Sequence, residues 1–449
     1  MIGSEKIFPV LKQTLKASTA DQTEAMLIAH DSQLTRFANN YIHQNVAETN
    51  AVLSVRAVMG NRQGVATTND LSTEGIERAV ETARLSASKQ PEDPDFHGLT
   101  ESPAAQTIPV FDEQTAGFSP EERARAVDII CRKAKERSVI GSGYFKTSTV
   151  ETAVANSLGT MNYHVGTVAD VSMTAMTDDS AGRAQASAWK VSELNPEEIG
   201  DEAIDKAHRG QHPRKVEPGE YTIIAEPYVT EDLVIMLAWI GMSAMAVQEE
   251  RSWMNERMGK QAMNSLISIW DDGNDPMGCP SPFDYEGVPR QRVSIVEKGV
   301  VGSPLYDTYT ARKENRHSTG HATPLGFGLG PFPLNLFMAG GESTLEDMVK
   351  STKRGLYIAT FWYTRPMHPR DAVITGMTRD GVFMIENGEI THPVKNLRFT
   401  QSYVDALANV EMVSRETQRI TWEFEQGINF TARIPALKIS AFKFTGSTV

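Results

Sequence analysis

A weak internal repeat in the first two hundred residues is the feature that most constrains the fold. One copy runs from residues 36–40 to an amphipathic helix predicted over 72–87, and the other runs from 153–159 to a helix predicted over 195–208. The sequence between each start and its helix alternates in the manner of strands. We therefore expect a duplicated unit of strands followed by one helix, although asparagine-containing turns could produce similar strings independently.

Helix start signals and strand patterns indicate the fold class. Ser119, Pro120 and Glu122 form a capping box that predicts a further helix. The strings QRVSIVEKGVV and GVFMIENGEI predict antiparallel pairs, the second turning at Asn387-Gly388, and ALKISAFKF predicts a last strand. Strands joined by tight turns, with segregated helices, indicate an α+β fold built mostly from antiparallel sheets.

The length of the chain predicts more than one hydrophobic core, and we expect two domains. An α+β domain over 1–215 would contain both repeats, with a linker rich in Pro, Asp and Glu at about 91–109. A β-rich domain over 216–449 would follow. After Pro227, apolar residues recur at helical spacing and predict one core helix. These residues are Leu233, Leu237, Ile240, Ala244 and Val247.

Composition excludes several classes of protein. The formal net charge of −13 argues against a nucleic-acid-binding surface, which would be rich in Lys and Arg. We expect no signal peptide, and the longest apolar stretch, 233–247, is too short to cross a membrane. Cys131 and Cys279 lie far apart in the sequence, which favours a reducing compartment and a cytoplasmic location. Cys131 lies beside the apolar face of its helix, so we expect it to be buried and unreactive.

The stretch from 301 to 364 is where we expect a functional site. It holds a loop with two histidines, the extended segment LNLFMAGG, a helix and the strand LYIATFWYT. Ser343 and Glu346 have the spacing of a capping box, and Gly355 is expected to end the helix.

His317 and His321 are the only local candidates for metal ligands, and we reject them. Their spacing would place both on one face of a helix, but the glycines and proline around them indicate a loop. These residues are Gly320, Pro324, Gly326, Gly328 and Gly330. Glu314 is the only further ligand nearby, and zinc sites need three protein ligands. We expect His321 to form hydrogen bonds within the loop.

Two acidic pairs could be read as general acid and base. Glu249-Glu250 and Asp271-Asp272 are both expected to be solvated surface residues instead, because carboxylates are seldom buried without partners. We therefore predict no catalytic residue from them.

Several strings in this sequence resemble one known family. They include FDEQTAGFSPEERARAV, VANSLGT, SPFDYEGVPRQRVSIVEKGVVGSPLYDTYTARK, STGHATPLG and LNLFMAGGESTLEDMVKSTKRGLYI, in matching order. They are similar to the TldD/PmbA family. The resemblance implies a two-domain α+β protein related to zinc peptidases of the TldD type, which work with a PmbA subunit, also called TldE. The name "modulator of DNA gyrase" is also attached to the family.

The resemblance implies a zinc motif that this chain lacks. TldD-type members carry HExxxH on a helix of the C-terminal domain, with a later cysteine completing the site. Residues 238–243 match that place best and contain no ligand. No His lies between His212 and His317, and no Cys follows Cys279. STGHA also resembles the PmbA side of the family. We therefore expect a TldE/PmbA-type subunit with no catalytic residue, metal or cofactor of its own.

The resemblance also implies a partner and a substrate. We expect a zinc-bearing TldD-type paralogue or a homodimer, with an extended peptide lying as an added strand along residues 334–341. The residues predicted to contact it are Asn335, Phe337, Ala339, Gly340 and His321. A plain core strand would explain the same segment. An autonomous peptidase with another site, and an interaction protein acting on a partner such as gyrase, remain open alternatives.

Overall fold

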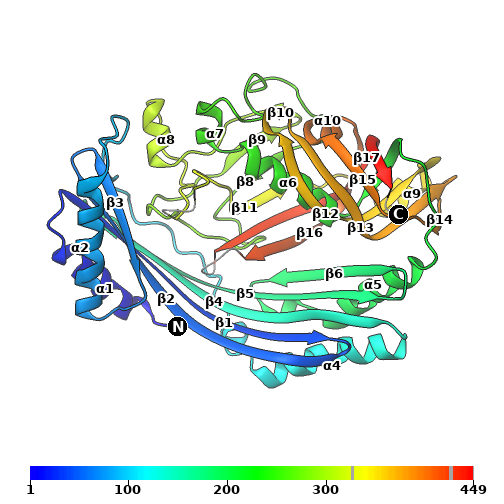
Figure 1. Ribbon diagram of the computed structural model, residues 1–449, viewed down its shortest axis with the longest axis horizontal. Helices are drawn as coiled ribbons and strands as arrows, with labels where there is room; N and C mark the ends of the chain where they lie inside the picture. The colour runs from blue at the N-terminus through cyan, green and yellow to red at the C-terminus, as the bar shows by residue number, and fades with distance from the viewer. Residues whose placement is uncertain (325–327, 424–427, 448–449) are drawn as a thin grey trace.

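The computed structural model describes residues 1–324, 328–423 and 428–447, and it shows two β-sheets that lie against each other (Figure 1). In the described residues the first sheet has six strands in the order β3-β2-β1-β4-β5-β6, all antiparallel. Its strands are β1 (Gln22–Ala38), β2 (Tyr41–Met59), β3 (Arg62–Thr68), β4 (Ile140–Asn156), β5 (Met161–Met176) and β6 (Ala181–Ala188).

This first sheet confirms the internal repeat. The strand order is symmetric about the central β1–β4 pair, and each copy contributes three consecutive strands followed by one helix. The turn at Asn39-Asn40 follows β1, and the corresponding turn after Asn156 follows β4. Both Asn39 and Asn40 have positive φ, as a tight hairpin turn requires. The repeat is longer than expected, because a helix also precedes each set of strands.

Four helices accompany the two copies: α1 (Ser4–Ala17), α2 (Thr73–Lys89), α4 (Pro120–Glu136) and α5 (Pro196–Arg209). Helix α4 begins with the expected capping box, since Ser119 Oγ accepts from Glu122 N and Ser119 N donates to the Glu122 carboxylate. Cys131 is 4% exposed within the core that α4 and α5 form with the sheet. The short helices α3 (Glu113–Ala116) and η1 (Val191–Glu193) lie in the connections.

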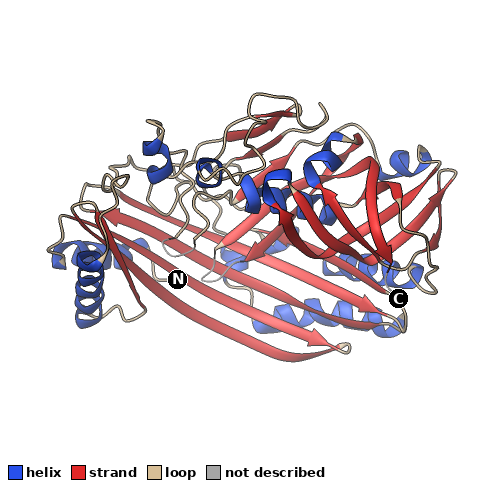
Figure 2. Cartoon of the chain, turned by 45° about the horizontal axis from the view of Figure 1, so that its top comes forward, coloured by secondary structure: helices blue, strands red, loops and turns tan. Residues whose placement is uncertain are grey.

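The second sheet is mixed and contains eleven strands within the described part of the chain. Figure 2 shows its strands beside the long strands of the first sheet. Its main order is β10-β9-β8-β11-β17-β15-β13-β12-β7, with β14 on β13 and β16 on β17. The strands are β7 (Glu220–Ala225), β8 (Ile269–Asp271), β9 (Val293–Glu297), β10 (Val300–Val301), β11 (Asn335–Met338), β12 (Arg354–His368), β13 (Val373–Glu386), β14 (Glu389–Pro393), β15 (Leu397–Ser402), β16 (Val410–Glu423) and β17 (Asn429–Ser447). The β11–β17 and β12–β7 pairs are parallel.

Both hairpins expected in this half are present. The β9–β10 pair is antiparallel, and β13 turns into β14 through Asn387 and Gly388, both with positive φ. The remaining helices are α6 (Pro227–Gly241), α7 (Ala244–Gln248), α8 (Thr308–Lys313), α9 (Leu345–Lys350), α10 (Tyr403–Ala408) and η2 (Pro369–Asp371). The chain is therefore α+β, as expected. None of the helices in the described ranges combines the length and apolarity that a bilayer span requires.

The segment between the two repeats, expected to be a linker, contacts β2 and β4. Residues 91–109 have no regular structure, but Phe96 and Leu99 are buried beside Val58. Asn156 Nδ2 also donates to Thr100 O at 2.7 Å. This segment therefore packs against the first sheet.

The prediction of a single continuous helix after Pro227 is wrong, because α6 ends at Gly241 and a separate helix, α7, begins at Ala244. Trp253 packs against Gly241 so closely that a Cβ there would lie 2.4 Å from its Cδ1. Trp253 Nε1 donates to Leu237 O at 2.8 Å, and Ser252 Oγ donates to Gly241 O at 2.6 Å. These contacts use carbonyl groups at the end of the helix and stop it there.

The start and end expected for the helix near residue 345 are also wrong. Thr344, not Ser343, is the N-cap, and Asp347 completes the capping box. Ser343 instead bridges to Ser414. The helix ends at Lys350, and Gly355 lies in β12 between Thr222 and Ile385. Gly355 is needed there because a Cβ would lie 2.5 Å from Thr222 O.

Candidate functional site

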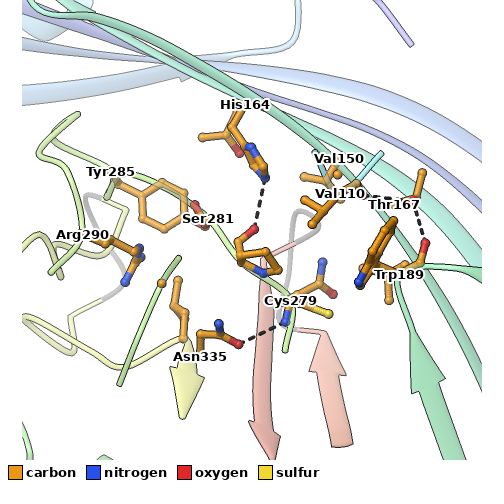
Figure 3. Close-up of a pocket in the computed structure, with 17 residues that line it drawn as sticks. Val110, Val150, His164, Thr167, Trp189, Cys279, Ser281, Tyr285, Arg290 and Asn335 are labelled. Atoms are coloured by element: carbon orange, nitrogen blue, oxygen red, sulfur yellow. Dashed lines mark hydrogen bonds between the residues drawn. The ribbon is translucent and has the colours of Figure 1, made fainter. Parts of the chain in front are cut away.

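A cavity of about 70 Å³ lies where the two sheets meet (Figure 3). Strands β4 and β5 contribute Val150, His164 and Gly166, and the segment before β9 contributes Cys279, Ser281, Tyr285 and Arg290. Asn335, at the start of β11, lies at its base with Leu334. Residues from distant parts of the sequence therefore meet at one place.

His164, on β5, connects the first sheet to the segment that precedes β9 at this cavity. Its Nε2 lies 3.1 Å from Pro280 O, as Figure 3 shows. Burial lowers the pKa of His164 to about 4, so the ring is neutral and Nε2–H donates to that carbonyl. The imidazole therefore has a structural contact and is not poised as a base for a neighbouring group.

Cys279 brings a thiol, a potential nucleophile, to the cavity. Its thiol lies 3.9 Å from Thr421 Oγ1, and its backbone N–H donates to Asn335 Oδ1 at 3.1 Å. An active thiol needs an adjacent base or cation, and the group beside this sulfur is a hydroxyl. The arrangement suits binding better than covalent catalysis.

Arg290 is the most unusual residue of the cavity. Its side chain is 4% exposed, and Nε makes a long contact of 3.4 Å with Phe283 O. Neither Nη1 nor Nη2 has a hydrogen-bond partner among the residues that the structure describes. A buried cation without a partner is costly, so this group marks the cavity as a place for an anionic or polar ligand.

Two of the residues predicted from the sequence, His321 and Asn335, are brought together by Asp271. His321 Nε2 donates to Asp271 Oδ1 at 2.9 Å, and Asn335 N donates to Asp271 Oδ2 at 2.8 Å. The other ring nitrogen of His321 lies 2.9 Å from Thr319 Oγ1. Burial lowers the pKa of His321, and a neutral ring with its proton on Nε2 satisfies both contacts. His321 therefore has the hydrogen-bonding role expected of it.

The surface location expected for Asp271 is wrong. Asp271 is 0% exposed, whereas Glu249 and Glu250 are exposed as expected. The signal for its burial was present in the sequence. Asp271 lies two residues after the buried Ile269, and side chains two apart on a strand point to the same face. For Arg290 we find no such local signal.

The strand-addition geometry expected for residues 334–341 does not occur. Strand β11 pairs with β8 on one side and with β17 on the other, so it is an interior strand. Phe337 is 4% exposed and stacks on Trp270, with ring centroids 5.6 Å apart. Of the five predicted substrate residues, Asn335 lines the cavity, Ala339 and Gly340 retain exposure, and Phe337 and His321 are buried.

His317 and His321 do not form a shared site. His317 is exposed in the loop after α8, whereas His321 is fully buried with both ring nitrogens engaged. Gly326, which was one basis for predicting a loop here, lies outside the described residues. Within the described residues, no group of three or more His, Cys, Asp or Glu side chains is arranged to hold a metal ion.

Residues 238–243, at the end of α6, do not fit a zinc ion. Ala238, Ile240 and Met242 are buried apolar residues, and Trp239 is 44% exposed with its ring against Phe332. Nothing in this stretch supplies an imidazole, thiolate or carboxylate. Two carboxylates do lie earlier on α6: burial raises the pKa of Glu231 and raises that of Asp232 to about 6. Both precede the expected motif by more than a turn, and Asp232 accepts hydrogen bonds from Tyr403 and Thr364.

Three family models match consecutive parts of the chain. They are described as PmbA/TldA metallopeptidase domain 1, over residues 24–87, the central domain, over 112–211, and the C-terminal domain, over 218–446. The first two models together span nearly all of the six-stranded sheet with helices α2, α4 and α5, and the third spans the mixed sheet. The breaks between the models fall in the connections 88–111 and 212–217.

Individual proteins agree with this result. The chain is 25% identical to the metalloprotease PmbA of Escherichia coli O157:H7 over 383 residues, which is 82% of each chain. It is 21% identical over 437 residues to a metalloprotease TldD homolog of Buchnera aphidicola, covering 92% of this chain and 89% of that one. The crystal structure of TldE from Thermococcus kodakarensis shares the fold, with a TM-score of 0.87 at 19% identity over 98% of this chain and 100% of that one. The chain belongs to the PmbA/TldD metallopeptidase family.

Proposed function

We propose that this chain is a TldE/PmbA-type subunit of a peptidase system, without a metal site of its own. It would act with a zinc-bearing TldD-type partner, or as a homodimer, and help to enclose an extended peptide. The observation that carries this proposal is the end of α6, where the family resemblance places a zinc motif and this chain has Ala238, Trp239 and Met242. Hydrolysis would then depend on the partner's zinc.

The chain's own contribution would be to hold the peptide. Asn335 would meet it at the cavity, and Ala339 and Gly340 would offer accessible backbone at the end of β11. Phe337 and His321 would support that segment from within, because both are buried.

The two cysteines are unpaired, with Cys131 buried, and we place the protein in the cytoplasm on that basis.

Reconstitution tests this function. The purified chain would be mixed with the HExxxH-bearing relative from the same genome and with an unfolded peptide. We expect a complex in size-exclusion chromatography and faster cleavage than the relative gives alone. Absence of a complex, together with an unchanged cleavage rate, would reject the proposal. Cleavage by this chain alone would favour an autonomous peptidase.

A further inference from the structure

The guanidinium group of Arg290 lies beside a cavity and has no partner for four of its N–H donors. Figure 3 shows Arg290 with Tyr285 and Asn335 among the residues that surround the cavity. The described part of the chain provides no hydrogen-bond acceptor for Nη1 or Nη2 and no carboxylate within ion-pair distance of the side chain. We propose that this cavity binds a carboxylate group, which pairs with Arg290.

The two buried carboxylates near Arg290, Asp284 and Asp271, already accept hydrogen bonds from other groups. Asp284 accepts backbone hydrogen bonds from Glu286, Val288 and Ala322, each at 2.9 Å. Asp271 accepts from His321 and from Asn335 N. Burial raises the pKa of Asp284 to about 8 and lowers the pKa of His321, and the positive charge of Arg290 opposes the first shift and adds to the second. The chain therefore positions a cation that its own acids do not neutralise.

The backbone around Arg290 is shaped to hold this side chain in place. A Cβ on Gly273 would lie 2.1 Å from Arg290 Cδ, so only glycine leaves room for the side chain there. Asn274 Nδ2 donates to Arg290 O at 2.9 Å and fixes the backbone. This is a built site rather than a surface arginine that happens to lie over a hollow.

Size and lining favour a carboxylate over a larger anion. About 70 Å³ is room for a few water-sized groups, which suits a carboxylate and the first carbons attached to it. A guanidinium pairs with a carboxylate through two parallel hydrogen bonds. Val110, Val150 and Leu334 supply apolar walls for the attached carbons. Trp189 and Tyr285 retain partial exposure at the rim, so the cavity is accessible.

The carboxylate could come from the C-terminus of a peptide or from a small free acid, and the experiment separates these sources. The full chain would be titrated by calorimetry with acetate, with the tripeptide N-acetyl-Ala-Ala-Leu and with the C-terminal amide of that peptide. We expect the free-acid peptide to bind at least about tenfold more tightly than the amide, since the amide cannot form the ion pair. If the peptide acid binds more tightly than acetate, the ligand is the C-terminus of a peptide. If the two bind with equal affinity, the ligand is a small free acid.

Variants connect the binding to the site. In Arg290→Gln the preference for the acid over the amide should disappear, whereas Arg316→Gln, at an exposed arginine, should keep it. Gly166→Val tests the cavity without touching Arg290. A Cβ on Gly166 meets only ordinary contacts at 3.5 Å and beyond, so the first carbon of the new side chain fits without a clash. The two further carbons of valine should occupy part of the cavity that Gly166 lines.

Gly166→Val should therefore lose carboxylate binding even if Arg290→Gln folds poorly. Equal affinity for acid and amide in the unaltered chain, together with no binding of acetate, would overturn the proposal. So would an acid preference that survives in Arg290→Gln. The site belongs to this chain alone, so these results do not depend on whether a zinc-bearing partner exists.

Discussion

His321 Nε2 lies 2.9 Å from Asp271 Oδ1, and both side chains are 0% exposed. This pair ties the loop after α8 to the end of β8, and Asp271 in turn accepts from the first residue of β11. Of the two histidines in this loop, His321 is buried in this pair and His317 is exposed at the surface.

Replacing His321 with alanine should destabilise the fold strongly. The substitution leaves the Asp271 carboxylate buried with one hydrogen bond fewer, which should lower the free energy of unfolding by about 1.5–3 kcal/mol. Urea denaturation followed by circular dichroism measures this. The exposed His317→Ala is the matched control and should stay within about 0.5 kcal/mol of the unaltered chain. Equal effects of both substitutions would contradict the buried pair.

Asp232 should make stability depend on pH. Its carboxylate accepts from Tyr403 Oη at 2.7 Å and from Thr364 Oγ1 at 2.8 Å, and burial raises its pKa to about 6. Between pH 4 and pH 6 the folded chain keeps a proton that the unfolded chain releases. The stability that Asp232 contributes is therefore complete below its unfolded pKa and is lost as the pH rises through about 6.

In Asp232→Asn this titration is absent. From about pH 4.5 to about pH 7.5, the free energy of unfolding of the unaltered chain should fall relative to the variant by roughly 1–3 kcal/mol. Denaturation at several pH values measures the difference. Asp405→Asn, at an exposed position on α10, should leave the pH dependence unchanged. A difference that stays constant or grows in the opposite direction would refute the account of Asp232.

Breaking the buried ion pair of Arg56 and Glu24 should lower the free energy of unfolding far more than breaking the exposed ion pair of Arg62 and Glu92. Arg56 Nη2 lies 2.8 Å from Glu24 Oε1 and 3.4 Å from Glu286 Oε1, which belongs to the other half of the chain. Arg56→Met leaves both acids without their cation and should cost about 3–5 kcal/mol of unfolding free energy. Arg62→Met, which breaks the exposed pair with Glu92, should cost at most about 1 kcal/mol.

Adding Glu24→Leu to Arg56→Met should recover part of the loss, because an apolar pair replaces an unpaired buried charge. Thermal and urea unfolding of the three variants would provide the comparison. A double variant that is less stable than Arg56→Met would show that Glu24 has another role.

Replacing Gly241 with a residue that has a side chain should destabilise the fold, because Trp253 occupies the space beside it. Gly241→Ala would place a Cβ 2.4 Å from Trp253 Cδ1, and the resulting displacement should cost about 1–3 kcal/mol. Gly219→Ala, whose Cβ would meet only Tyr221 at 3.8 Å, is the control and should be nearly neutral. Urea unfolding gives both values, and an unaltered stability for Gly241→Ala would contradict the packing that ends α6.

The sequence predicts those features that depend on neighbouring residues. Ser119 and Glu122 start α4 because a capping box needs only four consecutive positions, and Asn387-Gly388 turns because its residues accept positive φ. The repeat was recognisable because each copy contains the same local pattern, alternating strand residues followed by an amphipathic helix. The strings that resemble the TldD/PmbA family predicted the family correctly, since three family models match the chain.

Features set by distant contacts could not be predicted. The end of α6 depends on Trp253, and the residue that pairs with the buried Asp271 is His321, fifty residues away. The interior position of β11 depends on β17 at the end of the chain. Arg290 carries no local signal at all, since its importance arises from partners that are missing around it.

The metal content and activity of the isolated chain test the central claim most directly. The chain would be purified alone, equilibrated with zinc, dialysed and analysed by mass spectrometry for metal, with peptide hydrolysis followed in the presence and absence of a chelator. We predict less than about 0.1 zinc ions per chain and no chelator-sensitive hydrolysis, because α6 lacks ligands. One tightly bound zinc per chain, with hydrolysis that the chelator abolishes, would contradict this account.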